Sequence, residues 1–269
     1  MPVRSPLINV MIAAVQKAAR KLTRDFGEIE NLQVSKKGPA DFVSTADKRS
    51  EKILHEELSK ARPRFGFVME EAGEIKGEDD SNRWIIDPLD GTTNFLHSLP
   101  HFAISVALER DSEPFAAVVY DPIKDEMFWA EKGAGAHLNS RRLRVSSREA
   151  MNESLFATGI PFLGLPHHDV FQEQMTAVSS QSSGVRRMGS AALDLAYVAA
   201  GRYEGYWENG LNYWDVAGGI LLVREAGGFV TTMDGGRRFK MGAGIIASNE
   251  RLRTTFSKIV TDATKKAKA

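Results

Sequence analysis

Residues 84–94, Trp-Ile-Ile-Asp-Pro-Leu-Asp-Gly-Thr-Thr-Asn, form the segment with the clearest chemical meaning. An apolar run delivers two carboxylates, Asp87 and Asp90, into a turn. Pro88 favours an extended backbone at Asp87, and the Asp-Gly pair permits a sharp reversal that exposes backbone N–H groups. If residues 91–94 open a helical turn, its free amides suit a phosphate oxygen. The pattern indicates carboxylates beside phosphate donors, although a plain surface turn after a strand also explains it.

Two further acidic residues lie at the edges of apolar runs elsewhere in the chain. Glu70 follows the apolar residues 67–69, and Asp215 lies in a Trp-Asp-Val-Ala-Gly-Gly segment. If both meet Asp87 and Asp90, each close pair repels by roughly 4 kcal/mol at about 4 Å and an effective dielectric of about 20. Shared protons would relieve this repulsion, but four oxygen ligands around an open space better suit Mg²⁺, which also binds substrate phosphate.

The composition excludes several other chemistries. Of 269 residues 42% are hydrophobic, which predicts a substantial core, and 35 basic residues balance 35 acidic ones. This balance gives no overall indication of a nucleic-acid or membrane-surface binder. The absence of cysteine excludes disulfides, thiolate catalysis and Cys-ligated zinc. Because no signal-peptide pattern and no run of about 18 apolar residues occur, we expect a cytoplasmic protein that does not span a membrane.

The acidic segments follow two stretches with helical periodicity. One amphipathic helix is predicted over residues 5–27 and a second over about 45–62, with a polar connection at 36–47. From residue 65 to 145 the pattern changes to short apolar runs between turn residues, which favours an antiparallel sheet packed on the two helices. These runs are 65–69, 84–86, 102–108, 115–120, 127–130 and 136–145.

After residue 145 helical and strand patterns alternate. Strands are predicted at 155–158, near 206, at 229–233 and at 244–247, and helices at 170–180, 190–201, 214–226 and from 250 onward. We therefore predict an N-terminal α+β lobe, residues 1–145, with most of the metal ligands. A C-terminal α/β lobe, residues 146–269, has a mixed sheet and carries Asp215 and the substrate contacts. No linker or repeat marks the boundary, so the lobes are expected to pack as one body.

In these segments the chain resembles the inositol monophosphatase family of magnesium-dependent, lithium-sensitive phosphatases over nearly its whole length. The resemblance rests on four segments that occur in the family's order: Glu70-Glu71, residues 84–95, Gly-Ser-Ala-Ala at 189–192 and residues 214–219. It implies a layered αβαβα sandwich of the sugar-phosphatase type and a homodimer. One departure is Ala72, where the family often has a small hydroxyl or acidic residue.

The resemblance also implies roles for individual residues. One metal would be surrounded by Glu70, Asp87, the Leu89 carbonyl and Thr92, and a second by Asp87, Asp90 and Asp215, with two or three Mg²⁺ per active site. The residues implied in catalysis are Glu70, Thr92 and Asp47, of which Thr92 and Asp47 help to activate the attacking water. The residues implied in substrate binding are Gly91, Thr92, Gly189, Ser190, Ala191, Glu208 and Asp215.

Several of these residues also have an ordinary structural interpretation. Ser190 could simply cap the Ala-rich helix that follows it, and Glu208 could be a solvated loop charge. Lys36 and Asp41 match the family's mobile loop near the metals, but residues of a plain surface loop would look the same.

The implied activity is hydrolysis of inositol monophosphate, or a similar small polyol phosphate, by a metal-activated water without a covalent phosphoenzyme. The lack of Cys and of a Gly-x-Ser-x-Gly elbow agrees with this route. Related families that share the acidic core act on fructose 1,6-bisphosphate, histidinol phosphate or nucleotide 3′-phosphates, and these alternatives stay open. Some bacterial proteins resembling the family also act as adaptors in transcription and RNA processing. The arginines within 141–148 are the sequence feature that could serve such a role, although a solvated hairpin face explains them as well.

Overall fold

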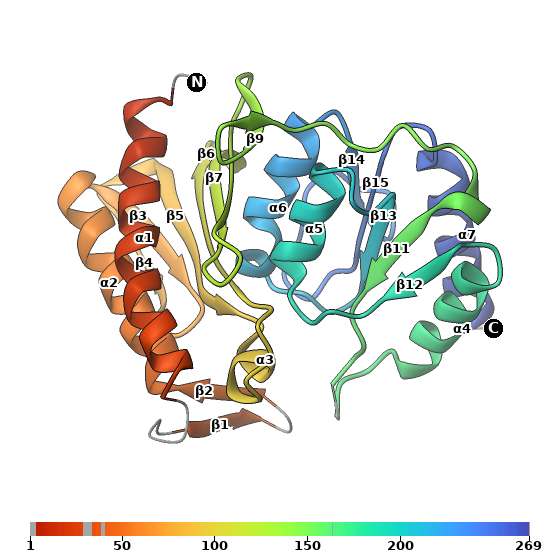
Figure 1. Cartoon of the computed structure of the whole chain (residues 1–269), viewed down its shortest axis with the longest axis horizontal. Coiled ribbons are helices and arrows are strands. Elements are labelled where there is room, and N and C mark those ends of the chain that lie inside the picture. The colour runs from red at the N-terminus through yellow and green to blue at the C-terminus, as the bar shows by residue number, and fades with distance from the viewer. Residues whose placement is uncertain (1–3, 29–33, 39–40, 163, 269) are drawn as a thin grey trace.

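The computed structural model describes residues 4–28, 34–38, 41–162 and 164–268, with only the backbone given over 34–43. Within these residues the chain forms five layers: two helices, an eight-stranded sheet, two helices, a five-stranded sheet and two helices (Figure 1). The helices, in layer order, are α1 Pro6–Phe26 with α2 Thr45–Ala61, α5 Ala191–Ala199 with α6 Tyr213–Glu225, and α4 His168–Ser179 with α7 Arg253–Lys266. The αβαβα sandwich expected from the sequence is confirmed.

The larger sheet has the strand order β10-β9-β8-β7-β6-β5-β3-β4. Its strands are β3 Phe65–Met69, β4 Gly73–Ile75, β5 Asp79–Asp90, β6 Ala103–Arg110, β7 Glu113–Asp121, β8 Glu126–Glu131, β9 Gly135–Leu138 and β10 Arg141–Arg142. Neighbours pair antiparallel, as predicted, except that β3 and β5 are parallel, with Met69 opposite Ile86. This parallel pair brings the C-terminal end of β3, where Glu70 follows, beside the end of β5.

The smaller sheet has the order β12-β11-β13-β15-β14 and is mixed, as predicted. Its strands are β11 Leu155–Thr158, β12 Gly184–Arg186, β13 Gly205–Glu208, β14 Phe229–Thr232 and β15 Ile245–Ser248. The β11–β12 and β11–β13 pairs are parallel, and the pairs that β15 makes are antiparallel.

The prediction of a polar connection over residues 36–47 is wrong. The strands β1 Val34–Gly38 and β2 Asp41–Ser44 form an antiparallel hairpin, and α2 begins at Thr45. Pairing between two short strands satisfies their backbone groups without the longer apolar alternation by which a strand is recognised in sequence. The side chains of Lys36 and Asp41 lie outside the described part of the chain.

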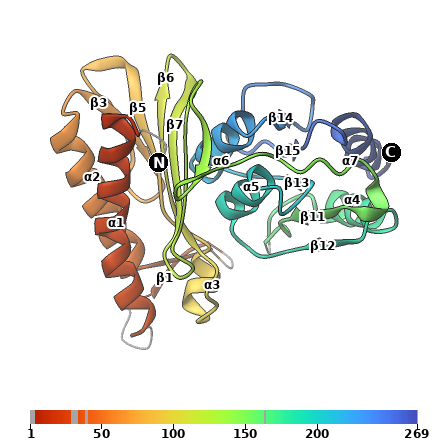
Figure 2. The ribbon, with the colours of Figure 1, turned by 45° about the horizontal axis from the view of Figure 1, so that its top comes forward.

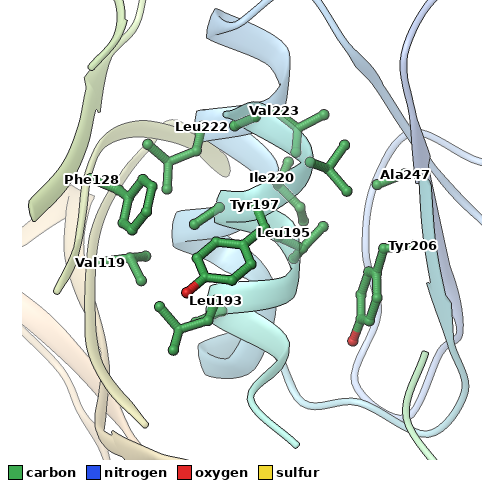
Figure 3. Packing of buried hydrophobic residues seen from close by; sticks show 14 of the residues in the cluster. Val119, Phe128, Leu193, Leu195, Tyr197, Tyr206, Ile220, Leu222, Val223 and Ala247 are labelled. Carbon is green, nitrogen blue, oxygen red and sulfur yellow. The ribbon is translucent and has the colours of Figure 1, made fainter. Parts of the chain in front are cut away.

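The middle helices α5 and α6 join the two sheets through one core. Figure 3 shows Leu195 of α5 and Leu222 of α6 between Phe128 of the larger sheet and Tyr206 of the smaller one, and all four belong to one buried cluster. A division into lobes at residue 145 therefore stays a prediction. Among the described helices, none combines the length and apolar character needed to cross a bilayer.

Candidate active site

The last residues of β5, which lead through a turn at Gly91 into α3 (Thr92–Leu96), include Asp87 and Asp90. Pro88 lies between them, and the Leu89 amide donates a hydrogen bond to Asp87 Oδ1 at 3.0 Å. Gly91 has φ +98°, and a Cβ placed there would lie 3.1 Å from the His101 carbonyl oxygen. Both the left-handed backbone and the crowding explain why glycine follows Asp90. The turn is therefore fixed tightly enough to hold two carboxylates in place.

Asp90 is anchored by the segment that precedes α5. The Ser190 hydroxyl donates to Asp90 Oδ2 at 2.6 Å, and the Ala192 amide donates to the same oxygen at 2.7 Å. The Leu193 amide in turn donates to Ser190 Oγ at 3.4 Å, so Ser190 also caps α5. The structural interpretation of Ser190 and its contact with the acidic turn are thus both present. Gly189 and Ala191 flank it and lie beside the same turn.

Asn94 fastens the same two segments together. Its Nδ2 atom donates to the carbonyl oxygens of His101 and Met188, each at 2.8 Å. The side chain is buried, and it links the first turn of α3 to the residues just before Gly189. Sequence reasoning assigned Asn94 no role, although it lies inside the recognised segment.

Asp215 stands in the first turn of α6, where its Oδ2 accepts a hydrogen bond from the Asn212 amide at 2.7 Å. The two glycines that follow set the position of this helix. A Cβ on Gly218 would lie 3.0 Å from Ser105 Oγ of β6, and one on Gly219 would lie 2.5 Å from the Leu195 side chain of α5. Since neither site has room for a larger residue, α6 packs close to both neighbours. The Gly-Gly pair thus fixes the helix that presents Asp215.

The carboxylates interact although they are far apart in sequence. Burial raises the pKa of Asp87 well above its usual range, and the charges of Glu70, Asp90 and Asp215 raise it further. Burial likewise raises the pKa of Asp215; the Asn212 amide opposes this shift, while Asp90 and Glu70 add to it. Burial raises the pKa of Asp90 to about 6, against the hydrogen bonds from Ser190 and Ala192. The fold therefore brings these four carboxylates near enough for their charges to act on Asp87.

The donor set of this acidic centre fits a hard divalent cation. In the described part of the chain, no three Asp, Glu or His side chains already stand at the spacing of a closed metal shell. All four side chains nevertheless offer carboxylate oxygens, which Mg²⁺ and Ca²⁺ prefer. The pKa values of Asp87 and Asp215 are raised by burial and also by the charges of Glu70 and Asp90, so negative charge is destabilised at both. A cation in their midst would reverse the sign of that interaction.

Thr92 and Asp47 form a hydrogen-bonded pair at the edge of this centre. The Thr92 hydroxyl lies 3.0 Å from Asp47 Oδ1 and 3.0 Å from the Leu89 carbonyl oxygen, and its one proton serves one acceptor at a time. Asp47 is fully buried, and Ser44 donates to its other oxygen from the amide at 2.8 Å and from the hydroxyl at 2.5 Å. Burial raises the pKa of Asp47, while the bonds from Ser44 and Thr92 lower it. The first turn of α2 thereby holds Asp47 rigidly toward Thr92.

Glu208 lies at the end of β13 and is not a solvated loop charge. The Tyr206 hydroxyl donates to Glu208 Oε2 at 2.5 Å, and burial raises the pKa of Glu208 to about 7. A Cβ on Gly159 would lie 1.9 Å from Glu208 Cδ, so the carboxylate rests directly over that glycine. The charge of Asp90 also raises the pKa of Glu208, which places Glu208 on the same side as the acidic centre.

Three residues of this region carry no recognisable signal in the sequence. Tyr206 and Gly159 hold Glu208 through contacts between strands, and no local pattern distinguishes them. Asp194, on α5, is buried, and its Oδ1 has no hydrogen-bond partner among the described atoms. Burial raises its pKa well above the usual range, and the charges of Glu208 and Asp90 add to the effect. Only their position in the folded chain connects them to the site.

The five-layered fold is shared with solved structures of inositol monophosphatases, a class of phosphatases. The chain belongs to the inositol monophosphatase family, whose sequence pattern matches residues 3–265. It is 54% identical over 257 residues to an inositol-1-monophosphatase from Mesorhizobium japonicum, covering 96% of this chain and 97% of that protein. It is also 41% identical over 247 residues to Nus factor SuhB from Escherichia coli, covering 92% of each.

A solved structure agrees with the sequence relatives. The crystal structure of extragenic suppressor protein suhB from Bartonella henselae superposes with a TM-score of 0.92 at 55% identity, covering 95% of this chain and 98% of that one.

Proposed function

We propose that this protein is a Mg²⁺-dependent phosphomonoesterase that hydrolyses inositol monophosphate or a similar small polyol phosphate. The observation that carries the proposal is that the charges of Glu70, Asp90 and Asp215 all act on Asp87, although these residues lie far apart in the sequence. When bound, two or three Mg²⁺ ions would neutralise phosphoryl charge and activate a water. The close relatives named inositol-1-monophosphatase support the choice of substrate class.

The residues around the centre divide the remaining work. If the Leu89 carbonyl oxygen bound a cation, the Thr92 hydroxyl would donate its hydrogen bond to Asp47, and Thr92 Oγ would be free to accept a hydrogen bond from the attacking water. Glu70 orients that water from the end of β3, and the amides of Gly91 and Thr92 hold the phosphate. No side-chain nucleophile takes part.

The polyol would lie between the Gly189–Ala191 segment and Glu208. The Ser190 hydroxyl and the Ala192 amide donate hydrogen bonds to Asp90. A substrate hydroxyl bound by the Gly189–Ala191 segment would therefore lie beside the proposed phosphate site. Since the pKa of Glu208 is about 7, this carboxyl can accept a hydrogen bond from a substrate hydroxyl near neutral pH. Tyr206 and Gly159 fix its direction, which favours a substrate with hydroxyls at a set distance from phosphorus.

The experiment is a comparison of phosphate release from a substrate panel. Inositol 1-phosphate, glycerol phosphate, fructose 1,6-bisphosphate, histidinol phosphate and a nucleotide 3′-phosphate are given to the wild type and two variants. Asp90→Asn should lower kcat on every substrate by about 10²- to 10³-fold or more, because it removes charge needed at the transition state. Glu208→Gln should mainly raise KM for inositol 1-phosphate.

The matched control for this panel is Asp262→Asn, an exposed carboxylate on α7. It should leave all rates unchanged. Near-normal turnover by Asp90→Asn would refute the assignment of the centre, and a wild type that prefers the bisphosphate or the nucleotide would replace the polyol with that substrate.

The same proposal includes a homodimer. Leu99 and Met188 are large apolar residues that are 52% and 38% exposed. Asn94 connects them, because its side-chain Nδ2 donates to the Met188 carbonyl oxygen and its backbone carbonyl oxygen accepts from the Leu99 amide. Exposed apolar side chains gathered in one place suit burial against a second copy. Sedimentation should give twice 29.7 kDa, and a monomer at micromolar concentration would overturn this part.

An adaptor role in transcription has weaker support. It rests on the relatives named Nus factor SuhB and on Arg141 and Arg142, which are exposed on β10. Arg148 is not available, because it forms an ion pair at 2.9 Å with the buried Glu204. The positive surface is therefore smaller than the sequence indicates, and a gel-shift assay with RNA would measure what remains.

A further inference from the structure

A second charged site is a cavity of about 160 Å³ beside α6, bounded by β5, the β6–β7 turn and the loop between β14 and β15. Figure 2 shows α6 lying against β6 and β7. The charged side chains that line the cavity are Arg83, Arg224, Arg237, Arg238, Glu109 and Glu113. Tyr213 and Phe239 add a stacked pair of rings, with centroids 6.4 Å apart and 16° between their planes.

The cavity and the acidic centre share a helix but not a face of it. Tyr213, Ile220 and Arg224 line the cavity, and their spacing of seven and four residues places them on one side of α6. Asp215 comes two residues after Tyr213 and so points elsewhere. Arg224 lies nine residues beyond Asp215, about 13 Å along the axis at ~1.5 Å per residue. The two sites are therefore distinct.

The arginines of this cavity outnumber the carboxylates that neutralise them. Arg83 is fully paired, at 2.6 Å from Glu109. Arg224 and Arg238 share the single carboxylate of Glu113, at 3.4 and 4.0 Å. Arg237 forms no ion pair with any residue in the described part of the chain, and its carbonyl oxygen accepts a hydrogen bond from Arg224 at 2.9 Å. Three guanidinium groups thus face one carboxylate, which leaves a surplus of two positive charges.

This surplus acts on a partly buried group. The Arg224 side chain is only 24% exposed. Burial lowers the pKa of Arg224; Glu113 opposes the shift, and the positive charge of Arg237 adds to it. Guanidinium does not lose its proton in proteins, so the unfavourable charge persists unless an anion compensates it.

We propose that the cavity binds a phosphate-sized oxyanion, held by Arg224, Arg237 and Arg238. Its volume of about 160 Å³ is enough for a phosphate or a sulfate. Planar guanidinium groups match a tetrahedral oxyanion through paired N–H donors. The ring of Phe239, stacked on Tyr213, limits the cavity on one side and excludes larger ligands.

The test is calorimetric titration of the full-length protein with inorganic phosphate in the presence of a chelator. Without a cation the acidic centre repels phosphate, so binding reports on the arginine cavity. The wild type should show one saturable site, and the double variant Arg237→Gln/Arg238→Gln should bind at least about tenfold more weakly. Both arginines are exposed, so the fold should survive their replacement, which a melting curve checks.

Two controls complete the titration. Arg251→Gln, an exposed arginine 3.8 Å from the exposed Glu149, should bind phosphate like the wild type. Sulfate should compete with phosphate, whereas chloride at the same ionic strength should not. Absence of saturable binding, equal affinity in the double variant, or displacement by chloride would each overturn the proposal.

Discussion

The acidic centre and the arginine cavity meet the same physical problem with opposite sign. Each gathers more charge of one kind than its neighbours neutralise, and each lies against α6. In the acidic centre, Asp87 and Asp215 are pushed toward their protonated forms by burial and by the charges of Glu70 and Asp90. In the cavity, Arg224 is opposed by burial and by Arg237. A ligand of the opposite charge would therefore stabilise either region.

The two regions differ in what happens when that ligand is absent. A carboxylate can take up a proton and so remove its own charge, but an arginine cannot release one at any ordinary pH. The acidic centre therefore has two ways to relieve its repulsion, protons or a cation, and the choice depends on pH. In the arginine cavity, only the binding of an anion can relieve the repulsion between the positive charges. This difference predicts that pH controls the stability of one site and leaves the other unchanged.

The largest effect should appear as a pH-dependent loss of stability after metal removal. The folded protein holds the pKa of Asp90 at about 6 and that of Glu208 at about 7, above the unfolded values of 3.8 and 4.5. Between these values the folded state binds more protons than the unfolded state, so the free energy of unfolding falls as pH rises. The stability is fully present below about pH 4 and is lost as pH passes through about 6 to 7.

Melting curves in chelator measure this loss. From about pH 5.5 to about pH 7.5, Asp90 and Glu208 together should lower the free energy of unfolding by roughly 2–3 kcal/mol, which lowers Tm by about 4–5 °C. Saturating Mg²⁺ should raise Tm most at the higher pH, where the carboxylates are ionised. Asp90→Asn should melt higher than the wild type in chelator at about pH 7.5, since it removes one crowded charge. A Tm in chelator that stays level or rises with pH would contradict this account.

The sequence predicted the elements whose boundaries are local. Residues 5–27 were expected to form the first helix, and α1 spans Pro6–Phe26 because Ser5 accepts from the Ile8 amide at 3.2 Å and Gly27 follows. The run 65–69 is β3 itself. The hairpin of β1 and β2, the short β4 and the parallel pairing of β3 with β5 were not predicted. Each depends on a partner strand and leaves too short a pattern in the chain to be recognised.

The candidate site shows the same limit. Its four carboxylates could be found because each stands at the edge of an apolar run and the segments resemble a known family. Tyr206 and Gly159 could not be found, because their roles come from tertiary contacts with Glu208. Asn94 lies inside the recognised segment, but its role depends on a tertiary contact with the residues before Gly189. The arginine cavity left no signal either. Arg83 and Arg224 lie far apart in the chain, and in sequence each looks like an ordinary surface charge.

The smallest effect should come from replacing Glu113. This substitution should change anion binding in the cavity without affecting the acidic centre. The Glu113 carboxylate is the anion that Arg224 and Arg238 share, so it competes with any phosphate that enters. Glu113→Gln keeps the size of the side chain and removes the charge. Exposed ion pairs contribute about 0.2–1 kcal/mol, and Glu113 is 39% exposed, so phosphate should bind roughly two- to fivefold more tightly.

The same titration in chelator measures this gain, and Glu149→Gln, which removes the carboxylate beside Arg251, provides the matched control with no change expected. Tighter binding in Glu113→Gln with unchanged pH dependence of Tm would show that the two charged sites respond to different ions. Weaker binding would mean that Glu113 orients the arginines rather than competing with the ligand. The surplus positive charge of the arginines would then result from the packing of α6. In that case Glu113 would be needed to hold Arg224 and Arg238 in position for the anion.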